Sequence, residues 1–101
     1  MARPPRLSDE EVASQLAELP GWTLRAGKLH RELDCGTFVE AFALMSRMAL
    51  VSERMNHHPE WSNVYGKLVI DLSTHDAGGL TALDFAWARE LESSGYGGPS
   101  R

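Results

Sequence analysis

The segment from Thr37 to Met55 constrains the fold most, because apolar residues occur on nearly every side of one predicted helix. Thr37 and Glu40 have the spacing of an N-terminal cap, and Pro59 keeps the preceding residue out of helical geometry. A helix that is apolar nearly all round requires cover on more than one side. The main predicted stripe consists of Phe38, Phe42, Met45, Ala49 and Met55.

Two hairpins flank that helix in the sequence. Apolar and polar residues alternate in residues 22–33, around Ala26 and Gly27, and in residues 61–73, around Gly66. In the first hairpin, one face is predicted to be buried and the other to meet solvent. The buried set is Trp22, Leu24, Leu29 and Leu33, and the solvent-facing set is Thr23, Arg25, Lys28, His30 and Glu32.

Two shorter helices complete the predicted fold. Ser8 with Glu11, and Thr81 with Asp84, have the spacing of capping boxes that begin helices. The order is therefore α-β-β-α-β-β-α, which predicts an α+β two-layer sandwich: a four-stranded, mainly antiparallel sheet with helices packed on one face. Such a sheet covers the long helix on one side only, so we expect a homodimer or homotetramer in which a second subunit covers the other.

Length and composition indicate one domain over residues 1–101, ordered from about 7 to 92, with flexible tails at 1–6 and 93–101. The net charge of −4 and scattered basic residues speak against direct nucleic-acid binding. No apolar run approaches the roughly 18 residues of a membrane span, and the first residues lack the apolar core of a secretory signal. A single cysteine, Cys35, fits a reducing compartment, so we expect a cytoplasmic protein.

The stretch NHHPEW, residues 56–61, places two histidines side by side where the long helix ends. A third histidine, His75, lies in the loop between the second hairpin and the last helix. These two loops can lie at the same end of the sheet, and functional residues concentrate in loops. His30 belongs to the solvent-facing side of a hairpin, and no role is assigned to it.

Three interpretations of these histidines remain open. They can be loop residues without a role. They can bind a metal, although His57 and His58 point in opposite directions when adjacent in an extended segment, and no cysteine lies near them. They can transfer protons, because an imidazole with a pKa near 6.5 donates or accepts protons at neutral pH. Two or three around one pocket suit a reaction in which one proton arrives and another leaves.

Two acidic residues are placed to support these histidines. Glu53 precedes His57 by about one helical turn and is expected to orient it, although a surface charge at a helix end is the plainer interpretation. Asp84, at the start of the last helix, is expected to cap that helix and is also able to face the pocket.

Taken together, these residues resemble the signature of the pterin-4a-carbinolamine dehydratases. The similarity extends from about Leu7 to Leu91, nearly the whole chain. It includes Gly21-Trp22, Glu53, His57-His58-Pro59, Tyr65, Ser73-Thr74-His75, Gly79-Leu80-Thr81 and Asp84.

The resemblance implies a reaction and roles for residues. The substrate is a 4a-hydroxytetrahydropterin, which loses water to give the quinonoid dihydropterin in tetrahydrobiopterin recycling, and no metal or organic cofactor is required. Glu53 and Asp84 are implied to support the histidines. His57 and His75 are implied as the proton-transfer pair, His58 as the group that holds and polarises the pterin, and Asn56, Ser73, Thr74 and Trp61 as substrate-binding residues.

A second class of function stays open. Animal members of the resembled family also act as dimerisation cofactors for a transcription factor, through the exposed surface of the long helix. The apolar surplus on that helix makes a protein-interaction module, or a pterin-binding protein without catalysis, the alternative to an enzyme. A homo-oligomer interface accounts for the same surplus, and we favour it.

Overall fold

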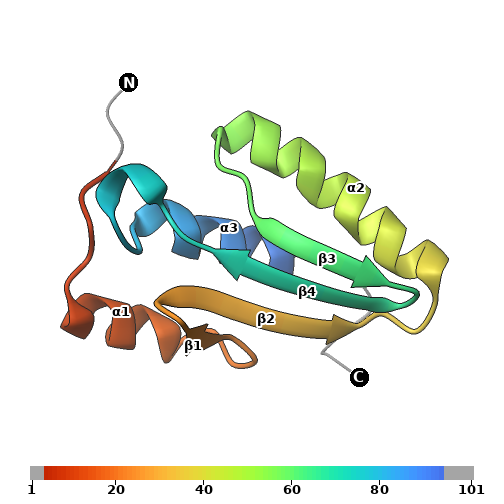
Figure 1. Cartoon of the computed structure of the whole chain (residues 1–101), viewed down its shortest axis with the longest axis horizontal. Coiled ribbons are helices and arrows are strands. Elements are labelled where there is room, and N and C mark those ends of the chain that lie inside the picture. Colours follow the sequence, from red (N-terminus) through yellow and green to blue (C-terminus); the bar gives the residue numbers. More distant parts are fainter. Residues whose placement is uncertain (1–3, 95–101) are drawn as a thin grey trace.

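The computed structural model describes residues 4–94, so most of the two predicted flexible tails lies outside the described residues. It contains three α-helices, four strands and one 3₁₀ turn (Figure 1). The strands form one sheet in the order β1-β2-β4-β3, with every neighbouring pair antiparallel. The predicted α+β architecture is confirmed. The elements are α1 (Asp9–Leu16), β1 (Thr23–Arg25), β2 (Lys28–Asp34), α2 (Phe38–Met55), β3 (Glu60–Val64), β4 (Lys67–Leu72), η1 (His75–Ala77) and α3 (Ala82–Glu92).

The predicted caps begin the helices. Ser8 and Glu11 form a reciprocal capping box on α1, and Thr81 and Asp84 form another on α3. The side chain of Thr37 accepts a hydrogen bond from the N–H of Glu40 at the start of α2. Each cap gives partners to N–H groups that a helix end leaves unpaired, so the three helices begin where the sequence indicates.

The second hairpin turns tightly at Tyr65 and Gly66, where the strands β3 and β4 meet. A Cβ atom on Gly66 would lie 2.9 Å from the carbonyl carbon of Gly36, so only glycine fits at this close approach. The N–H of Cys35 also donates to the carbonyl oxygen of Gly66 at 2.7 Å. This hairpin is therefore fixed against the segment that leads into α2.

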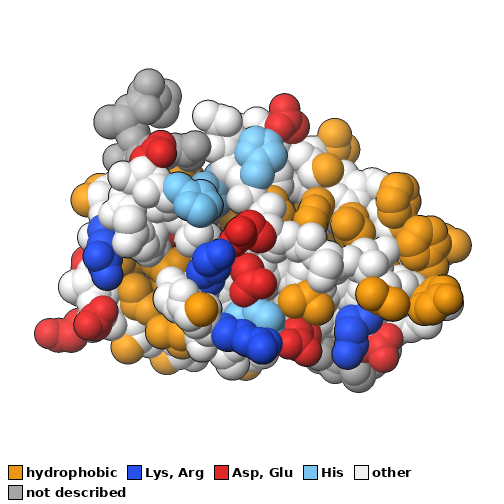
Figure 2. Space-filling view, in the orientation of Figure 1, with side chains coloured by type: hydrophobic (Ala, Val, Ile, Leu, Met, Phe, Trp, Pro, Cys, Tyr) orange, Lys and Arg blue, Asp and Glu red, His pale blue; other side chains and the backbone are white. Residues whose placement is uncertain are grey.

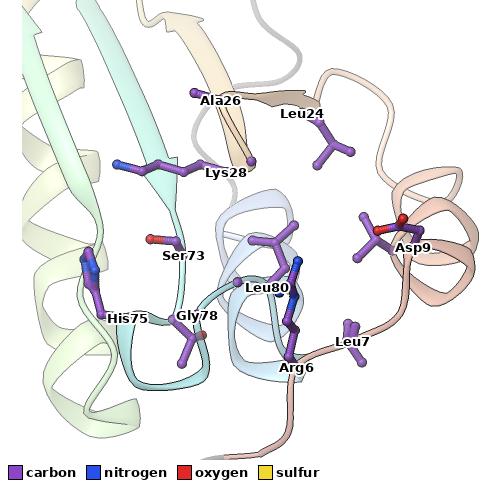
Figure 3. Close-up of a pocket in the computed structure, with 14 residues that line it drawn as sticks. Arg6, Leu7, Asp9, Leu24, Ala26, Lys28, Ser73, His75, Gly78 and Leu80 are labelled. Carbon is purple, nitrogen blue, oxygen red and sulfur yellow. The ribbon is translucent and has the colours of Figure 1, made fainter.

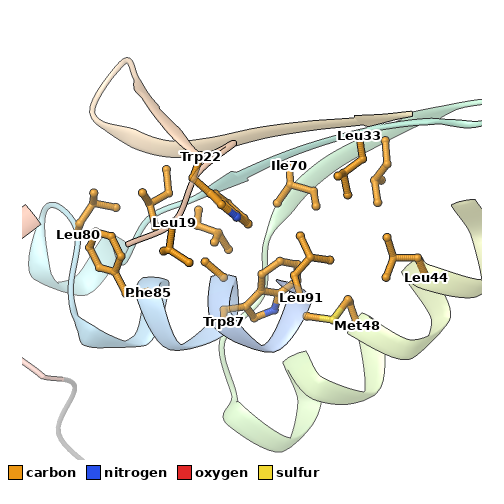
Figure 4. Close-up of a cluster of buried hydrophobic side chains, with 14 of the residues drawn as sticks. Leu19, Trp22, Leu33, Leu44, Met48, Ile70, Leu80, Phe85, Trp87 and Leu91 are labelled. Carbon is orange, nitrogen blue, oxygen red and sulfur yellow. The ribbon is translucent and has the colours of Figure 1, made fainter. Parts of the chain in front are cut away.

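The core lies between the helices and one face of the sheet (Figure 4). Leu33 and Ile70 point from the strands toward Trp87 and Leu91 of α3 and toward Leu44 and Met48 of α2. Leu68, Ile70 and Leu72 are all fully buried, as their alternation in β4 predicts. The indole N–H of buried Trp87 donates to the hydroxyl of Ser52 at 2.9 Å, so its polar atom has a partner inside the core.

The predicted stripe of α2 is wrong in part: Met45 and Met55 pack against the core, whereas Phe38, Phe42 and Ala49 are exposed. The residues that α2 buries are Ala41, Leu44, Met48 and Ser52, whereas Phe38 and Phe42 contact each other on the exposed side, with ring centroids 5.7 Å apart. Because the helix is apolar nearly all round, its periodicity fits more than one stripe. Figure 2 shows hydrophobic side chains gathered over α2 on the right of the molecule.

Leu24 and His30 also differ from prediction. Leu24 pairs with Leu29 and shares its face, yet 49% of its surface is exposed, because β1 is a short edge strand and Leu24 borders a hollow. His30 is on the outer face as predicted but only 8% exposed, since side chains of neighbouring strands enclose it. Its Nδ1 lies 2.8 Å from Asp71 and its Nε2 lies 2.8 Å from Glu32.

Among the residues that the structure describes, no helix combines the length and hydropathy needed to cross a membrane.

Candidate active site

The junction after α2 sets the direction of both adjacent histidines. Asn56 adopts the left-handed conformation, with φ 51° and ψ 46°, and ends the helix. Its N–H donates to the carbonyl of Glu53 at 3.2 Å, and the N–H of His57 donates to that of Ser52 at 3.0 Å. This pair of bonds is a Schellman motif, for which asparagine is among the few suitable non-glycine residues. The chain therefore leaves the helix in one defined direction.

His57 and His58 point to opposite sides of the chain. His57 is only 4% exposed, whereas the side chain of His58 is 54% exposed. The Nε2 atom of His57 lies 2.6 Å from Oδ1 of Asp84, and that of His58 lies 2.5 Å from Oε2 of Glu53. The expectation that Glu53 orients His57 is therefore corrected: Glu53 contacts His58, which is on its own exposed side, and Asp84 orients His57.

Asp84 is fully buried, and both of its carboxylate oxygens have partners. Oδ2 accepts the N–H of Thr81 at 2.9 Å and the hydroxyl of Thr74 at 2.8 Å, while Oδ1 faces His57. The same carboxylate thus caps α3 and contacts the imidazole. The capping hydrogen bond fixes the orientation of the Asp84 carboxylate, and the contact with Oδ1 then fixes the orientation of the His57 ring.

The hydroxyl groups around Asp84 have a determined direction. The N–H of Leu83 donates to Thr81 Oγ1 at 3.2 Å, and the hydroxyls of Thr81 and Thr74 lie 2.9 Å apart. Because the hydroxyl proton of Thr74 goes to Asp84, the shared hydrogen bond is donated by Thr81. This series of hydrogen bonds therefore ends at the carboxylate of Asp84, which accepts a hydrogen bond from each of its threonine partners.

This arrangement assigns the tautomer of His57. Because Oδ2 of Asp84 accepts from both Thr81 and Thr74, Asp84 acts as an acceptor carboxylate, and the geometry favours a hydrogen bond that Nε2 of His57 donates to Oδ1. Nδ1 is then the ring nitrogen left to meet a substrate. A buried histidine held in one tautomer by a carboxylate is a common arrangement for proton transfer.

Three histidines border one hollow of about 220 Å³. His75 is the first residue of the 3₁₀ turn, and its loop is closed by the pairing of Thr74 with Gly79. The loop after β4 therefore reaches the loop after α2, although the two are separated by a hairpin in the sequence. The lining consists of His57, His58, Ser73, Thr74, His75 and Asp76. Sequence reasoning missed Asp76, whose only signal is its position directly after His75.

The predicted substrate-binding residues divide into two groups. Ser73 and Thr74 border the hollow, whereas Asn56 and Trp61 are not part of its lining. Trp61 instead packs edge-on against Trp87 on the helix side of the sheet, with ring centroids 6.3 Å apart. It is a core neighbour and is not placed to stack on a ligand in the hollow.

The backbone N–H groups of Asn56, His57 and Thr74 are engaged within the fold. The N–H groups of Asn56 and His57 cap α2, and the N–H of Thr74 donates to the carbonyl of Gly79 at 3.0 Å. The hydroxyl of Thr74 is committed to Asp84. Of the two polar residues before His75, Ser73 is thus the one whose side chain carries no such commitment in the described part of the chain.

A second and larger hollow, of about 370 Å³, adjoins the first. Figure 3 shows the residues that line it. Both hollows are lined by Ser73, Thr74 and His75, so this short segment forms a wall that they share. The larger one extends between α1 and the β1–β2 hairpin and includes Arg6 and Leu24. Sequence reasoning missed it, because Arg6 belongs to the predicted tail and Leu24 to the predicted core.

Within residues 4–94, no three histidine, cysteine, aspartate or glutamate side chains are grouped so that they could hold a metal ion.

Comparison with known proteins identifies the family of this chain. The family model described as Pterin 4 alpha carbinolamine dehydratase matches residues 5–94. A Solibacter usitatus protein named "Putative pterin-4-alpha-carbinolamine dehydratase" is 52% identical over 92 residues, 91% of this chain and 97% of that protein. A protein of the same name from Prochlorococcus marinus (strain MIT 9515) is 47% identical over 89 residues, 88% of this chain and 93% of that protein.

A solved structure shows the same fold. It is the crystal structure of a protein from Brucella melitensis described as "transcriptional coactivator/pterin dehydratase", and its chain superimposes with a TM-score of 0.84 at 35% sequence identity. The match covers 92% of this chain and 99% of the Brucella chain. The family model, the relatives and the shared fold agree with the resemblance carried by the histidine signature. The chain therefore belongs to the pterin 4 alpha carbinolamine dehydratase family, which is named for a hydro-lyase, the class of enzyme that the sequence predicts.

Proposed function

We propose that this protein dehydrates a 4a-hydroxytetrahydropterin to the quinonoid dihydropterin by histidine acid–base catalysis, as a step in tetrahydrobiopterin recycling. The observation that carries the proposal is the hollow bordered by three histidines, one of which lies 2.6 Å from a buried carboxylate. Family membership supports the reaction class.

The reaction requires two proton transfers and no change of oxidation state. The bond between C4a and its hydroxyl oxygen breaks, and that oxygen leaves as water once it has received a proton. The N5 atom loses its proton, and the electron pair of its N–H bond forms the new double bond to C4a. One general acid and one general base complete this balance, each contributing on the order of 10²- to 10⁴-fold.

The two histidines proposed for these transfers are His57 and His75. His57 offers Nδ1 from a ring that Asp84 holds rigidly, and His75 borders the same hollow from the opposite loop. His58, which is exposed and paired with Glu53, is proposed to hold and polarise the pterin. Asp84 and Glu53 act through their histidines, and Ser73 is proposed to contact the substrate.

The test is the rate at which freshly generated 4a-hydroxytetrahydropterin loses water, with and without the purified protein. We expect the protein to accelerate the loss, and His75→Gln to remove most of the acceleration while the fold is kept. His30→Gln is the matched control, because His30 is enclosed by the sheet face and does not border the hollow. A folded protein that leaves the spontaneous rate unchanged would contradict the proposal.

A protein-interaction role remains the second candidate because of one observation: the side of α2 away from the sheet exposes large apolar residues, among them Leu50 at 74%. The related Brucella protein is described as a transcriptional coactivator as well as a dehydratase. If the rate test fails in a well-folded sample, this surface is the feature that the protein's function would use.

A further inference from the structure

We propose that the larger hollow binds the substituent on C6 of the pterin, and that Arg6 makes it selective for a substituent that ends in an anionic group. The inference rests on the proposed function, since it assumes that a pterin occupies the histidine hollow. It adds the substrate class that the histidines alone do not define.

The chemistry of the pterin ring places the substituent beside the reacting atoms. N5 is bonded to C4a, where the hydroxyl leaves, and to C6, which carries the substituent. A histidine close enough to exchange a proton with N5 is therefore also close to the first atom of the substituent. The opposite, pyrimidinone edge of the ring carries no such group.

The structure provides space at this position. His75 and Ser73 belong to the wall between the two hollows. The proposal places N5 at His75, so that the substituent on the neighbouring C6 enters the larger hollow. The histidine hollow measures about 220 Å³, below the range of about 300 to 1,000 Å³ usual for a small-molecule site. The larger hollow, at about 370 Å³, supplies the additional volume that a substituted pterin requires.

The walls of the larger hollow suit a flexible chain with a polar end. Leu7, Leu24 and Leu80 line it with apolar surface. The half-exposed Leu24, which the sequence predicts in the core, belongs to this wall. A ligand in the larger hollow would cover the exposed apolar surface of Leu24, and the burial of that surface would favour binding.

The cationic residues define the end of the substituent. Arg6 lies across the backbone of Gly79, where a Cβ atom would stand 2.7 Å from its Nε, and Figure 3 shows its side chain beside Leu80. Arg6 makes no ion pair with another residue in the described part of the chain. Lys28 adds a positive charge, although Glu60 engages it at 2.5 Å, and Asp9 adds one carboxylate. Arg6 is therefore the group available to an anion, either phosphate or carboxylate.

The experiment measures the dissociation constants of four oxidised, stable pterins by titration calorimetry: pterin, neopterin, neopterin monophosphate and folic acid. Wild type is compared with Arg6→Gln, Arg6→Lys and the control Lys67→Gln, which changes the same charge on an exposed residue of β4. Leu24→Trp tests occupancy separately, because a larger side chain fills the hollow from an already exposed position.

We expect neopterin monophosphate to bind wild type about fivefold more tightly than neopterin, the size of an exposed charge contact. The preference is lost in Arg6→Gln, is kept in Arg6→Lys and Lys67→Gln, and shrinks at high salt. The folic acid titration shows whether a carboxylate serves as well as a phosphate. Leu24→Trp is expected to weaken the substituted pterins and to leave unsubstituted pterin unchanged.

Equal affinity for neopterin and its monophosphate, or an Arg6→Gln variant that keeps the preference, would overturn the inference while leaving the dehydratase proposal intact. The inference is also overturned if Leu24→Trp weakens the binding of all four pterins equally in a sample whose thermal unfolding matches that of wild type. If no pterin binds to wild type, both the inference and the proposed function fail.

Discussion

At the scale of single residues, Asp84 connects the fold of the last helix to the chemistry of the site. Its carboxylate accepts from Thr81 and Thr74 through one oxygen and contacts His57 through the other. A capping residue is needed here whatever the protein does. The sequence therefore predicts the cap, whereas the contact with His57 depends on how two distant loops meet.

Replacing Asp84 by asparagine is predicted to reverse the tautomer of His57. The amide oxygen must still accept from Thr81 and Thr74, so the amide NH₂ faces Nε2, which then accepts, and the ring proton moves to Nδ1. We expect the dehydration rate to fall at least about tenfold, as a wrong tautomer does in other histidine enzymes. Nitrogen NMR of the imidazole measures the tautomer, with Thr81→Ser, which keeps the hydroxyl, as the control. An unchanged tautomer and rate would contradict the assigned role.

His30 is predicted to make folding stability depend on pH. Its hydrogen bond to Glu32, and then that to Asp71, raise the pKa of His30 above its ordinary value of about 6.5. The stabilisation is therefore fully present below about pH 6.5 and is lost as the pH rises through the raised pKa. We expect the free energy of unfolding, measured with urea, to decline across that range in wild type and to decline less in His30→Gln. His58→Gln, at an exposed position, serves as the control, and an identical decline in all three proteins would refute this.

At the scale of elements, the junction between α2 and β3 positions two histidines through one backbone conformation. Asn56 has a positive φ of 51°, which a β-branched residue adopts only with strain. Asn56→Val is predicted to cost about 1–2 kcal/mol of folding stability and to lower the dehydration rate, because the direction of His57 changes. Asn56→Gly, which tolerates the conformation, is expected to keep both. Chemical denaturation measures the stability of the two variants, and the rate assay measures their activity. If Asn56→Val matches Asn56→Gly in both, the backbone conformation of Asn56 does not position the histidines.

Local signals predict where elements begin and end better than which face they bury. The capping residues Ser8, Thr37 and Thr81 begin the helices in the structure as they do in the sequence. The facing of α2 could not be predicted, because apolar residues surround the helix and only the sheet decides which of them are covered. Leu24 shows the same limit in a strand: it shares the face of Leu29 as predicted, but it borders the larger hollow and stays half-exposed.

At the scale of the whole molecule, the exposed side of α2 is predicted to associate with a second copy of the chain. Val39, Phe42 and Leu50 are each more than half exposed, which is unusual for large apolar residues on one helix. We expect a homodimer or homotetramer by sedimentation, and a shift toward the 11.2 kDa monomer in a Phe42→Glu, Leu50→Glu double variant. Val69→Glu, on the sheet, is the control. A wild type that sediments as a monomer would contradict the prediction.

The sequence predicts which residues form the candidate site, but it does not predict how their side chains are arranged. The signature names His57, His58 and His75, and the structure brings them to one hollow. The signature does not reveal that Glu53 pairs with His58. Counting residues along a helix puts Glu53 one turn before His57, but the helix ends at Asn56, so His58 is the histidine that faces Glu53. The hollow that holds Arg6 exists only because the segment before α1 crosses the loop at Gly79, a contact between two segments far apart in the sequence.

The most direct test of histidine catalysis is the dehydration rate of freshly generated 4a-hydroxytetrahydropterin with wild type and with a His57→Ala, His75→Ala double variant, each checked for folding and for binding of oxidised pterin. We predict that both proteins bind pterin and that only wild type accelerates the loss of water. If the double variant binds pterin and still accelerates the reaction as wild type does, proton transfer by these histidines is not the basis of catalysis.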